Sequence, residues 1–196
     1  MICEFGRRAD TVAKASRGSS VMALPPVTLR VIAGVLVAIA FCSAPMRPAR
    51  AGSLTRATAA YARGDYVAAV NVLTPLALRG DANAQAFLGF MFENGYGAPQ
   101  VYDTAADLYC QAATRGNPFG QGMLGLMYDK GHGVPQDFIL AYKWLNLAAA
   151  RSPKHDRDYF IRLRNAVASK LSPAQIALGQ RLAMLWATAR HQELSP

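Results

Sequence analysis

Three histidines, His132, His155 and His191, are the side chains best able to bind a metal or to transfer protons near neutral pH. Helical zinc sites pair their histidines within one turn, as in the motif His-Glu-x-x-His. No two of these histidines have such a spacing, and His132 lies between two glycines of a predicted loop, where we expect it to be solvated. The sequence therefore predicts neither a metal site nor a cofactor.

The other candidates for catalysis are a carboxylate pair and a cysteine. Asp103 and Asp107 share one face of a predicted helix, but such a pair is more typical of a solvated face than of an acid–base pair. Cys110 follows Tyr109 with no histidine nearby in the sequence, which favours a buried, inert thiol over a nucleophile. The sequence also lacks the Gly-x-Ser-x-Gly, Gly-x-Gly-x-x-Gly and phosphate-loop motifs. These residues predict a protein that is not an enzyme.

The N-terminal region has features of an export signal. Residues 31–42 carry no charge and are too few to span a membrane, which takes about 20 residues, but they match the apolar core of a signal peptide. Ala49-Arg50-Ala51 has the small-x-small pattern that leader peptidases cleave. We expect residues 1–51 to be a targeting segment, with Met22 as a second candidate start, and the mature chain to be periplasmic. If the leader is not cleaved, residues 27–45 are expected to tether the protein to the inner membrane.

The net charge of +9 is divided unevenly along the chain. Residues 1–51 hold seven Lys/Arg against two Asp/Glu, residues 52–150 six against seven, and residues 151–196 eight against three. The basicity of the mature chain therefore lies at its C-terminal end, and because an exported protein would meet little nucleic acid, we do not expect a nucleic-acid partner. Removal of residues 1–51 also leaves Cys110 as the only cysteine, which predicts a domain without an internal disulfide.

A 36-residue repeat organises the rest of the sequence. Residues 81–116 and 117–152 align without gaps and are identical at 12 of 36 positions. Each repeat predicts two helices, as at 81–94 and 101–115, joined by a turn in which Gly95 is expected to adopt the left-handed conformation. Because one helical hairpin cannot bury its apolar face alone, neighbouring hairpins must stack. The small residues Gly89 and Gly125 are expected where paired helices approach closely.

The two ends of the repeat array are less regular. A first unit at about 53–80 is expected to have its second helix interrupted at Pro75. Residues 153–191 predict a C-terminal capping helix pair, a polar helix followed by one that begins with a capping box at Ser172-Pro173-Ala174-Gln175. We therefore expect residues 52–196 to form one domain with units at about 53–80, 81–116 and 117–152 and the cap at 153–191.

These repeats resemble the Sel-1-like repeats, a family related to the tetratricopeptide repeats. The second unit matches the family pattern at Leu124, Gly125, Tyr128, Gly131, Gly133, Val134, Asp137, Ala141, Trp144, Ala148 and Ala149, and the first at Ala82, Ala84, Leu88, Gly89, Gly95, Gly97, Ala105, Ala112, Ala113 and Gly116. Val101 stands where Asp is usual, and Leu108 where Trp is usual. The resemblance implies an all-α fold, a right-handed α-solenoid of helix-turn-helix repeats, which binds other proteins and often serves in exported bacterial regulators and assembly factors.

The first helices of such solenoids generally line the concave surface, which makes their outward positions candidates for a binding groove. The groove residues are Asn83, Phe87, Phe90, Asn94, Phe119, Met123, Leu126, Lys130, Tyr159 and Arg162, with His155 and Ala166 on the same stripe. Phe87 and Met123 are expected to be available to a partner, whereas Phe90 and Leu126 are expected to pack against the preceding unit. The stripes predict an apolar trough with a basic end, suited to an extended peptide or an amphipathic helix.

The sequence thus predicts an exported, periplasmic scaffold that binds another protein or peptide and regulates or assembles part of the cell envelope. Two other hypotheses remain open. Some cysteine-rich relatives in the family are described as β-lactamase-like, so a cell-envelope hydrolase or β-lactam-binding protein is one, although this chain lacks their regularly spaced cysteine pairs. The other is contact between the basic C-terminal end and an acidic polymer or a membrane surface, which salt would weaken.

Overall fold

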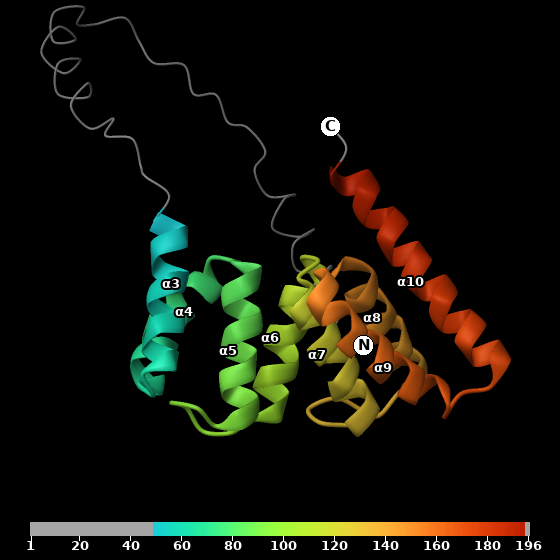
Figure 1. Ribbon diagram of the computed structural model, residues 1–196, viewed down its shortest axis with the longest axis horizontal. Helices are drawn as coiled ribbons and strands as arrows, with labels where there is room; N and C mark the ends of the chain where they lie inside the picture. Colours follow the sequence, from blue (N-terminus) through green and yellow to red (C-terminus); the bar gives the residue numbers. More distant parts are fainter. Residues whose placement is uncertain (1–48, 195–196) are drawn as a thin grey trace, which may run out of the picture.

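The computed structural model describes residues 49–194, which form helices joined by loops and contain no strand (Figure 1). In chain order the helices are α3 (Ala49–Ala62), α4 (Tyr66–Leu78), α5 (Ala82–Asn94), α6 (Tyr102–Thr114), α7 (Pro118–Lys130), α8 (Phe138–Arg151), α9 (Lys154–Ala168) and α10 (Pro173–Leu194). Each helix from α3 to α8 packs against the next, and α10 returns to pack along α8. This arrangement confirms the predicted α-solenoid of helical hairpins.

The predicted targeting segment and membrane tether lie almost entirely outside the described residues. Only Ala49–Ala51, the last three residues of that segment, fall within them, at the start of α3. Leader cleavage and the membrane tether therefore stay predictions. Within residues 49–194, none of the helices combines the length and the apolar character that a membrane crossing requires.

The helix ends follow the polar and glycine residues of the repeat. Asp81 and Asn117, one repeat apart, accept hydrogen bonds from the first-turn amides of α5 and α7, and Asp137 does the same for α8. At the position equivalent to Asp137, Val101 begins α6 without a capping side chain. Gly95 ends α5 at φ 70°, which confirms the predicted left-handed cap.

The predicted interruption at Pro75 is wrong, because α4 continues through this residue to Leu78. Proline removes one backbone donor and thereby deprives the carbonyl of Asn71 of its partner within the helix. Asn71 and Pro75 are both exposed, so water can solvate that carbonyl. The proline also lies in the last turn, where few hydrogen bonds remain to be broken.

The second glycine of each inter-helix turn forms a contact between units that the sequence analysis did not foresee. Gly97 and Gly133 adopt φ values of 71° and 67°. A Cβ on Gly97 would lie 2.4 Å from the carbonyl oxygen of Tyr66, and one on Gly133 would lie 2.2 Å from that of Tyr102. Each turn therefore rests directly on the backbone at the start of the preceding unit's second helix, and only glycine fits there.

A buried glutamine forms a second joint between units. The side-chain amides of Gln85 and Gln121 are 1% and 0% exposed and donate to the carbonyls of Ala77 and Ala113, at 3.1 and 3.2 Å. These carbonyls lie in the last turn of the preceding helix and also accept from the backbone amides of Gly80 and Gly116, so each glutamine adds a second donor that comes from the next unit. This explains why glutamine occupies the same position in both repeats.

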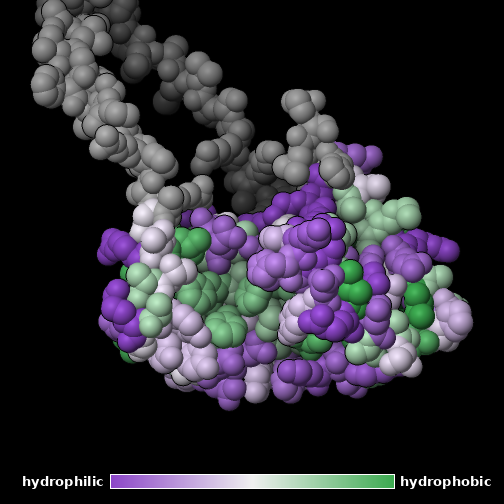
Figure 2. Space-filling view, viewed as in Figure 1, coloured by the Kyte–Doolittle hydropathy of each residue, from purple (hydrophilic) through white to green (hydrophobic). Residues whose placement is uncertain are grey.

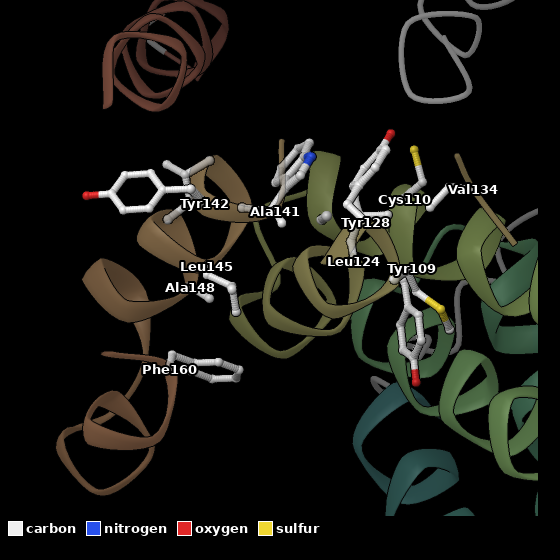
Figure 3. Close-up of a cluster of buried hydrophobic side chains, with 14 of the residues drawn as sticks. Tyr109, Cys110, Leu124, Tyr128, Val134, Ala141, Tyr142, Leu145, Ala148 and Phe160 are labelled. Carbon is white, nitrogen blue, oxygen red and sulfur yellow. The ribbon is translucent and has the colours of Figure 1, made fainter. Parts of the chain in front are cut away.

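The core between the helix layers is made of aliphatic and aromatic side chains with many alanines (Figure 3). Leu124, Leu145 and Phe160 are almost fully buried within it. Gly125 permits this packing, since a Cβ at its position would lie 2.8 Å from Cγ of Leu145. The close approach expected at this glycine is therefore present.

Cys110 is 7% exposed and disulfide-bonded, so it is not the free, inert thiol that was expected, whereas the absence of a disulfide within the mature domain stays a prediction. That expectation counted cysteines only after removal of residues 1–51, a segment that contains Cys3 and Cys42. Cys110 is the only cysteine among residues 49–194, so its partner lies outside the described residues.

Candidate functional site

The predicted groove residues occupy the first helices of three successive hairpins. Asn83, Phe87, Phe90 and Asn94 lie on α5, Phe119, Met123, Leu126 and Lys130 on α7, and Tyr159 and Arg162 on α9, with His155 and Ala166 beside them. The polar members and Tyr159 are exposed, whereas the apolar residues of α5 and α7, apart from Phe119, are half-buried.

The structure does not separate the two pairs that the sequence analysis distinguished. Phe87 and Phe90 are both half-buried and both contact the ring of Tyr61, with centroids 5.4 and 6.1 Å apart. Met123 and Leu126 are also half-buried. The role of these four residues in a groove stays a prediction, but Phe87, Phe90 and Met123 each combine core packing with accessible apolar surface.

Aromatic side chains from three hairpins form one continuous surface, which we call the aromatic surface; it consists of Tyr61, Tyr66, Phe87, Phe90, Tyr96 and Phe119. Tyr66 and Tyr96 stack with their centroids 4.8 Å apart, and Phe90 bridges Tyr96 to Phe119 at 5.9 and 6.4 Å. Phe119 is 42% exposed and the other five rings are half-buried. Figure 2 shows a hollowed apolar area over α5 beside α3, bordered by hydrophilic residues.

Three tyrosines of this surface were missed by the sequence analysis. Tyr96 lies in the turn after α5, and Tyr66 is the first residue of α4. Tyr61 lies near the end of α3, where only three residues lead to α4, against seven between α5 and α6. Because this turn is shorter, a count of 36 residues does not align Tyr61 with the residues that occupy the same place in the later units. The stack of Tyr66 on Tyr96 follows from the contact of Gly97 with the backbone of Tyr66.

A buried hydrogen bond supports the aromatic surface from below. The hydroxyl of Tyr109, a fully buried residue, donates to the Glu93 carboxylate at 2.8 Å, and its ring contacts that of Phe119. Burial, and then the neighbouring Glu93 charge, raise the pKa of Tyr109 far above its ordinary value. The phenol therefore stays protonated and acts as a structural donor.

The histidines and carboxylates show no arrangement typical of a reaction centre within the described residues. His132 is half-buried with its ring 4.6 Å from that of Tyr102, so it is less solvated than expected. Asp103 and Asp107 are both exposed on α6, and His155 contacts its neighbour Asp156 at 2.7 Å. Among residues 49–194 no group of three His, Cys, Asp or Glu side chains could hold a metal ion.

At the opposite end of the solenoid, α10 is anchored by an aromatic and cationic cluster. The rings of Trp144 and Trp186 meet edge to face at 5.7 Å, and the guanidinium of Arg151 lies 4.7 Å from the Trp186 ring. Arg190 donates to the carbonyls of Thr114 and Arg115. Burial, and then the charge of Arg190, lower the pKa of Arg151. At its start, α10 has the predicted capping box, with reciprocal bonds between Ser172 and Gln175 at 2.9 and 3.3 Å.

Comparison with known proteins identifies the family to which the repeats belong. The family model of the Sel1 repeat matches residues 82–117 and 118–153, whereas no curated protein matches the chain significantly. The crystal structure of a protective antigen of uropathogenic Escherichia coli strains, which displays an SLR fold, is similar with a TM-score of 0.64 and 24% identity, over 74% of this chain and 32% of that one. A Sel1 repeat protein from Oxalobacter formigenes shares 28% identity over 50% of this chain and 40% of that one, with a TM-score of 0.48.

The chain spans less than half the length of either solved structure. The first likeness concerns the fold alone, and it agrees with the stacked hairpins described above. The two matched segments coincide with the hairpins α5–α6 and α7–α8. The chain thus contains two Sel1 repeats, which occupy residues 82–117 and 118–153.

Proposed function

We propose that this protein is a non-enzymatic scaffold that binds an extended peptide or an amphipathic helix of another protein on its aromatic surface. A Sel1 repeat solenoid is suited to protein–protein interaction. The observation that carries the proposal is the continuity of the aromatic surface, in which half-buried rings from α3, α4, α5 and α7 lie edge to edge. Aromatic side chains contribute large contact area at small entropic cost, which is why they dominate interface energetics.

The polar residues around the aromatic surface suit a peptide backbone. The side-chain amide of Asn117, the N-cap of α7, donates to the side-chain oxygen of Asn83 at 2.8 Å, and Asn83 is exposed near the start of α5. Asn94 and Lys130 are exposed at the other ends of the same helices. An occupant lying across α5 and α7 would therefore meet an apolar floor with polar groups on two sides, as peptide-binding grooves generally provide.

The test compares two exposed apolar residues of equal accessibility. Phe119 on the aromatic surface and Leu178 on α10 are each 42% exposed. In cells that produce the tagged chain, in-cell crosslinking followed by mass spectrometry identifies the partner. We expect Phe119→Asp to reduce recovery of that partner at least about tenfold, as is typical of an aromatic residue at an interface centre, and Leu178→Asp to leave it unchanged. Undiminished recovery by a folded Phe119→Asp protein would contradict the proposal.

The alternatives open after the sequence analysis are decided by two further measurements. Partner capture through an apolar surface should change little between low and high salt, whereas contact of the basic C-terminal end with an acidic polymer should weaken steeply. A β-lactam-binding or hydrolytic protein should be acylated by, or turn over, a β-lactam reporter. We expect no such acylation, because Cys110 is disulfide-bonded and the hydroxyl of Tyr109, which donates to the Glu93 carboxylate, belongs to a fully buried side chain.

We also propose that the chain is exported to the periplasm, where it regulates or assembles part of the cell envelope. The support is the apolar run at 31–42 followed by the small-x-small motif at 49–51. The mature N-terminus, measured by mass spectrometry of the periplasmic fraction, should be Gly52. Recovery of the uncleaved chain in the membrane fraction would instead indicate the tether at 27–45.

A further inference from the structure

An open groove lies between α4, α5 and α6, away from the aromatic surface. Its volume is about 310 Å³, and its lining includes Leu78, Arg79, Gln85, Leu108 and Arg115. Leu78 stands at its rim with 84% of its surface exposed, the highest exposure of any large apolar side chain in the described part of the chain. An apolar residue left this accessible beside a cavity is a feature of contact surfaces.

The internal repeat shows what covers the equivalent place one unit later. Adding 36 to the residue numbers turns Leu78, Arg79, Leu108 and Arg115 into Thr114, Arg115, Trp144 and Arg151. All four of these later residues contact α10 through Trp186 or Arg190. Trp186 packs on Trp144 and beneath Arg151, and Arg190 donates to the carbonyls of Thr114 and Arg115. The chain's own helix thus occupies the later position.

The open groove offers the same partners to an incoming helix. The carbonyls of Leu78 and Arg79 end α4 as those of Thr114 and Arg115 end α6, and a helix C-terminus attracts a cation. The Arg115 guanidinium lies over Gly80 and donates to the Gln111 carbonyl of its own helix, an arrangement that leaves its face able to stack on an aromatic ring as that of Arg151 does. Leu108 is smaller than Trp144, which leaves room for a large ring.

We propose that the α4–α6 groove binds an amphipathic helix of a partner protein that presents a large aromatic residue and, four residues later, an arginine. Residues four apart share one face of a helix, and Trp186 and Arg190 have this spacing in α10. The aromatic residue fills the groove over Leu108 beneath Arg115, and the arginine caps the C-terminus of α4. This site is separate from the aromatic surface and does not depend on the function proposed for it.

The probe is a labelled synthetic peptide with the sequence of residues 173–194, titrated by fluorescence anisotropy against the full chain. We expect saturable binding that Leu78→Lys weakens by about tenfold or more, because the lysine removes apolar contact area and repels the arginine of the peptide. Val67→Lys is the matched control, since Val67 is 59% exposed on the same helix but at its opposite end. Alanine at the Trp186 or the Arg190 position of the peptide should weaken binding by a similar factor.

Four outcomes would overturn the proposal. The first is the absence of binding to a chain that circular dichroism shows to be folded. The second is binding that Leu78→Lys leaves unchanged, because the peptide then exchanges with the chain's own α10. The third is binding abolished by Phe119→Asp, which would place the peptide on the aromatic surface. The fourth is a dimer, seen by analytical ultracentrifugation and removed by Leu78→Lys, which would assign the groove to a second copy of this chain.

Discussion

Replacing Gly133 by alanine tests whether the second glycine of each turn joins neighbouring units. Gly133 lies in the turn between α7 and α8 at φ 67°, and its Cα faces the backbone of Tyr102 at the start of α6. The turn therefore connects the repeat at 118–153 to the repeat at 82–117. Alanine at this position has both an unfavourable backbone conformation and a Cβ that must displace the neighbouring helix.

The two contributions can be given separate magnitudes. The left-handed conformation costs an alanine about 1–2 kcal/mol relative to the right-handed one. The new Cβ would lie 2.2 Å from the Tyr102 carbonyl oxygen, far inside van der Waals contact, and such overpacking typically costs about 1–3 kcal/mol. Gly133→Ala should therefore lower the free energy of unfolding by about 2–5 kcal/mol in total. Gly64→Ala separates the two contributions, because Gly64 has φ 80° but no atom within 4 Å of the position that a Cβ would take.

The assay is urea denaturation followed by circular dichroism, with thermal melting as a second measurement. Gly64→Ala should cost only the conformational part, and each additional kcal/mol lost by Gly133→Ala should lower Tm by about 2–4 °C. Because repeats are stabilised by contacts with their neighbours, a weakened joint should also broaden the urea transition. Equal losses from the two variants, or a Gly133→Ala protein as stable as the parent, would refute the contact as the reason for this glycine.

Three further outcomes follow from the structure. Because the pKa of Tyr109 is raised above its ordinary value of about 10, the contribution of this residue to stability should be constant below that pH and fall above it by up to about 1.4 kcal/mol per pH unit, and Tyr109→Phe should reduce the loss of stability in alkaline urea titrations. Val101→Asp should stabilise α6 by about 0.5–2 kcal/mol in the same titrations, because it supplies the cap that Asp137 gives α8; no gain would contradict that interpretation. Trp186→Ala should cost less than the roughly 3–5 kcal/mol of a fully buried tryptophan, because Trp186 is half-buried, and should expose the amides of α10 to hydrogen exchange. Unchanged protection would show that the contact of Trp186 with Trp144 does not hold α10.

The solenoid and its register were predictable because the repeat is encoded locally. Helix starts at Asp81, Asn117 and Asp137 and the helix end at Gly95 each depend on a residue within a few positions of the boundary. Apolar periodicity then specifies which faces meet. Pro75 is an exception, because the cost of a proline depends on whether the deprived carbonyl is solvated, and local sequence does not reveal that.

The aromatic surface was only partly predictable because its tyrosines come from irregular positions. Phe87, Phe90 and Phe119 fall on the helical stripe of the repeats and were found by periodicity. Tyr61 and Tyr96 do not, because one belongs to a unit with a shorter turn and the other to a turn itself. Their contacts depend on how closely the turns approach the preceding unit, which is a property of the stacked structure.

Two of the positions at which the repeat at 82–117 departs from the family pattern, Val101 and Leu108, affect the same helix. Val101 leaves α6 without the capping side chain that Asp137 gives α8. Leu108 stands in α6 at the position that Trp144 has in α8, where Trp144 is 2% exposed and packs on Trp186. Both changes weaken the same helix, and the second also leaves the α4–α6 groove open. Since neighbours supply much of the stability of each unit, α6 relies on α5 and α7 more than α8 relies on its own neighbours. A helix that fills the groove would contact α6 at Leu108 and Arg115, so binding there should stabilise this helix.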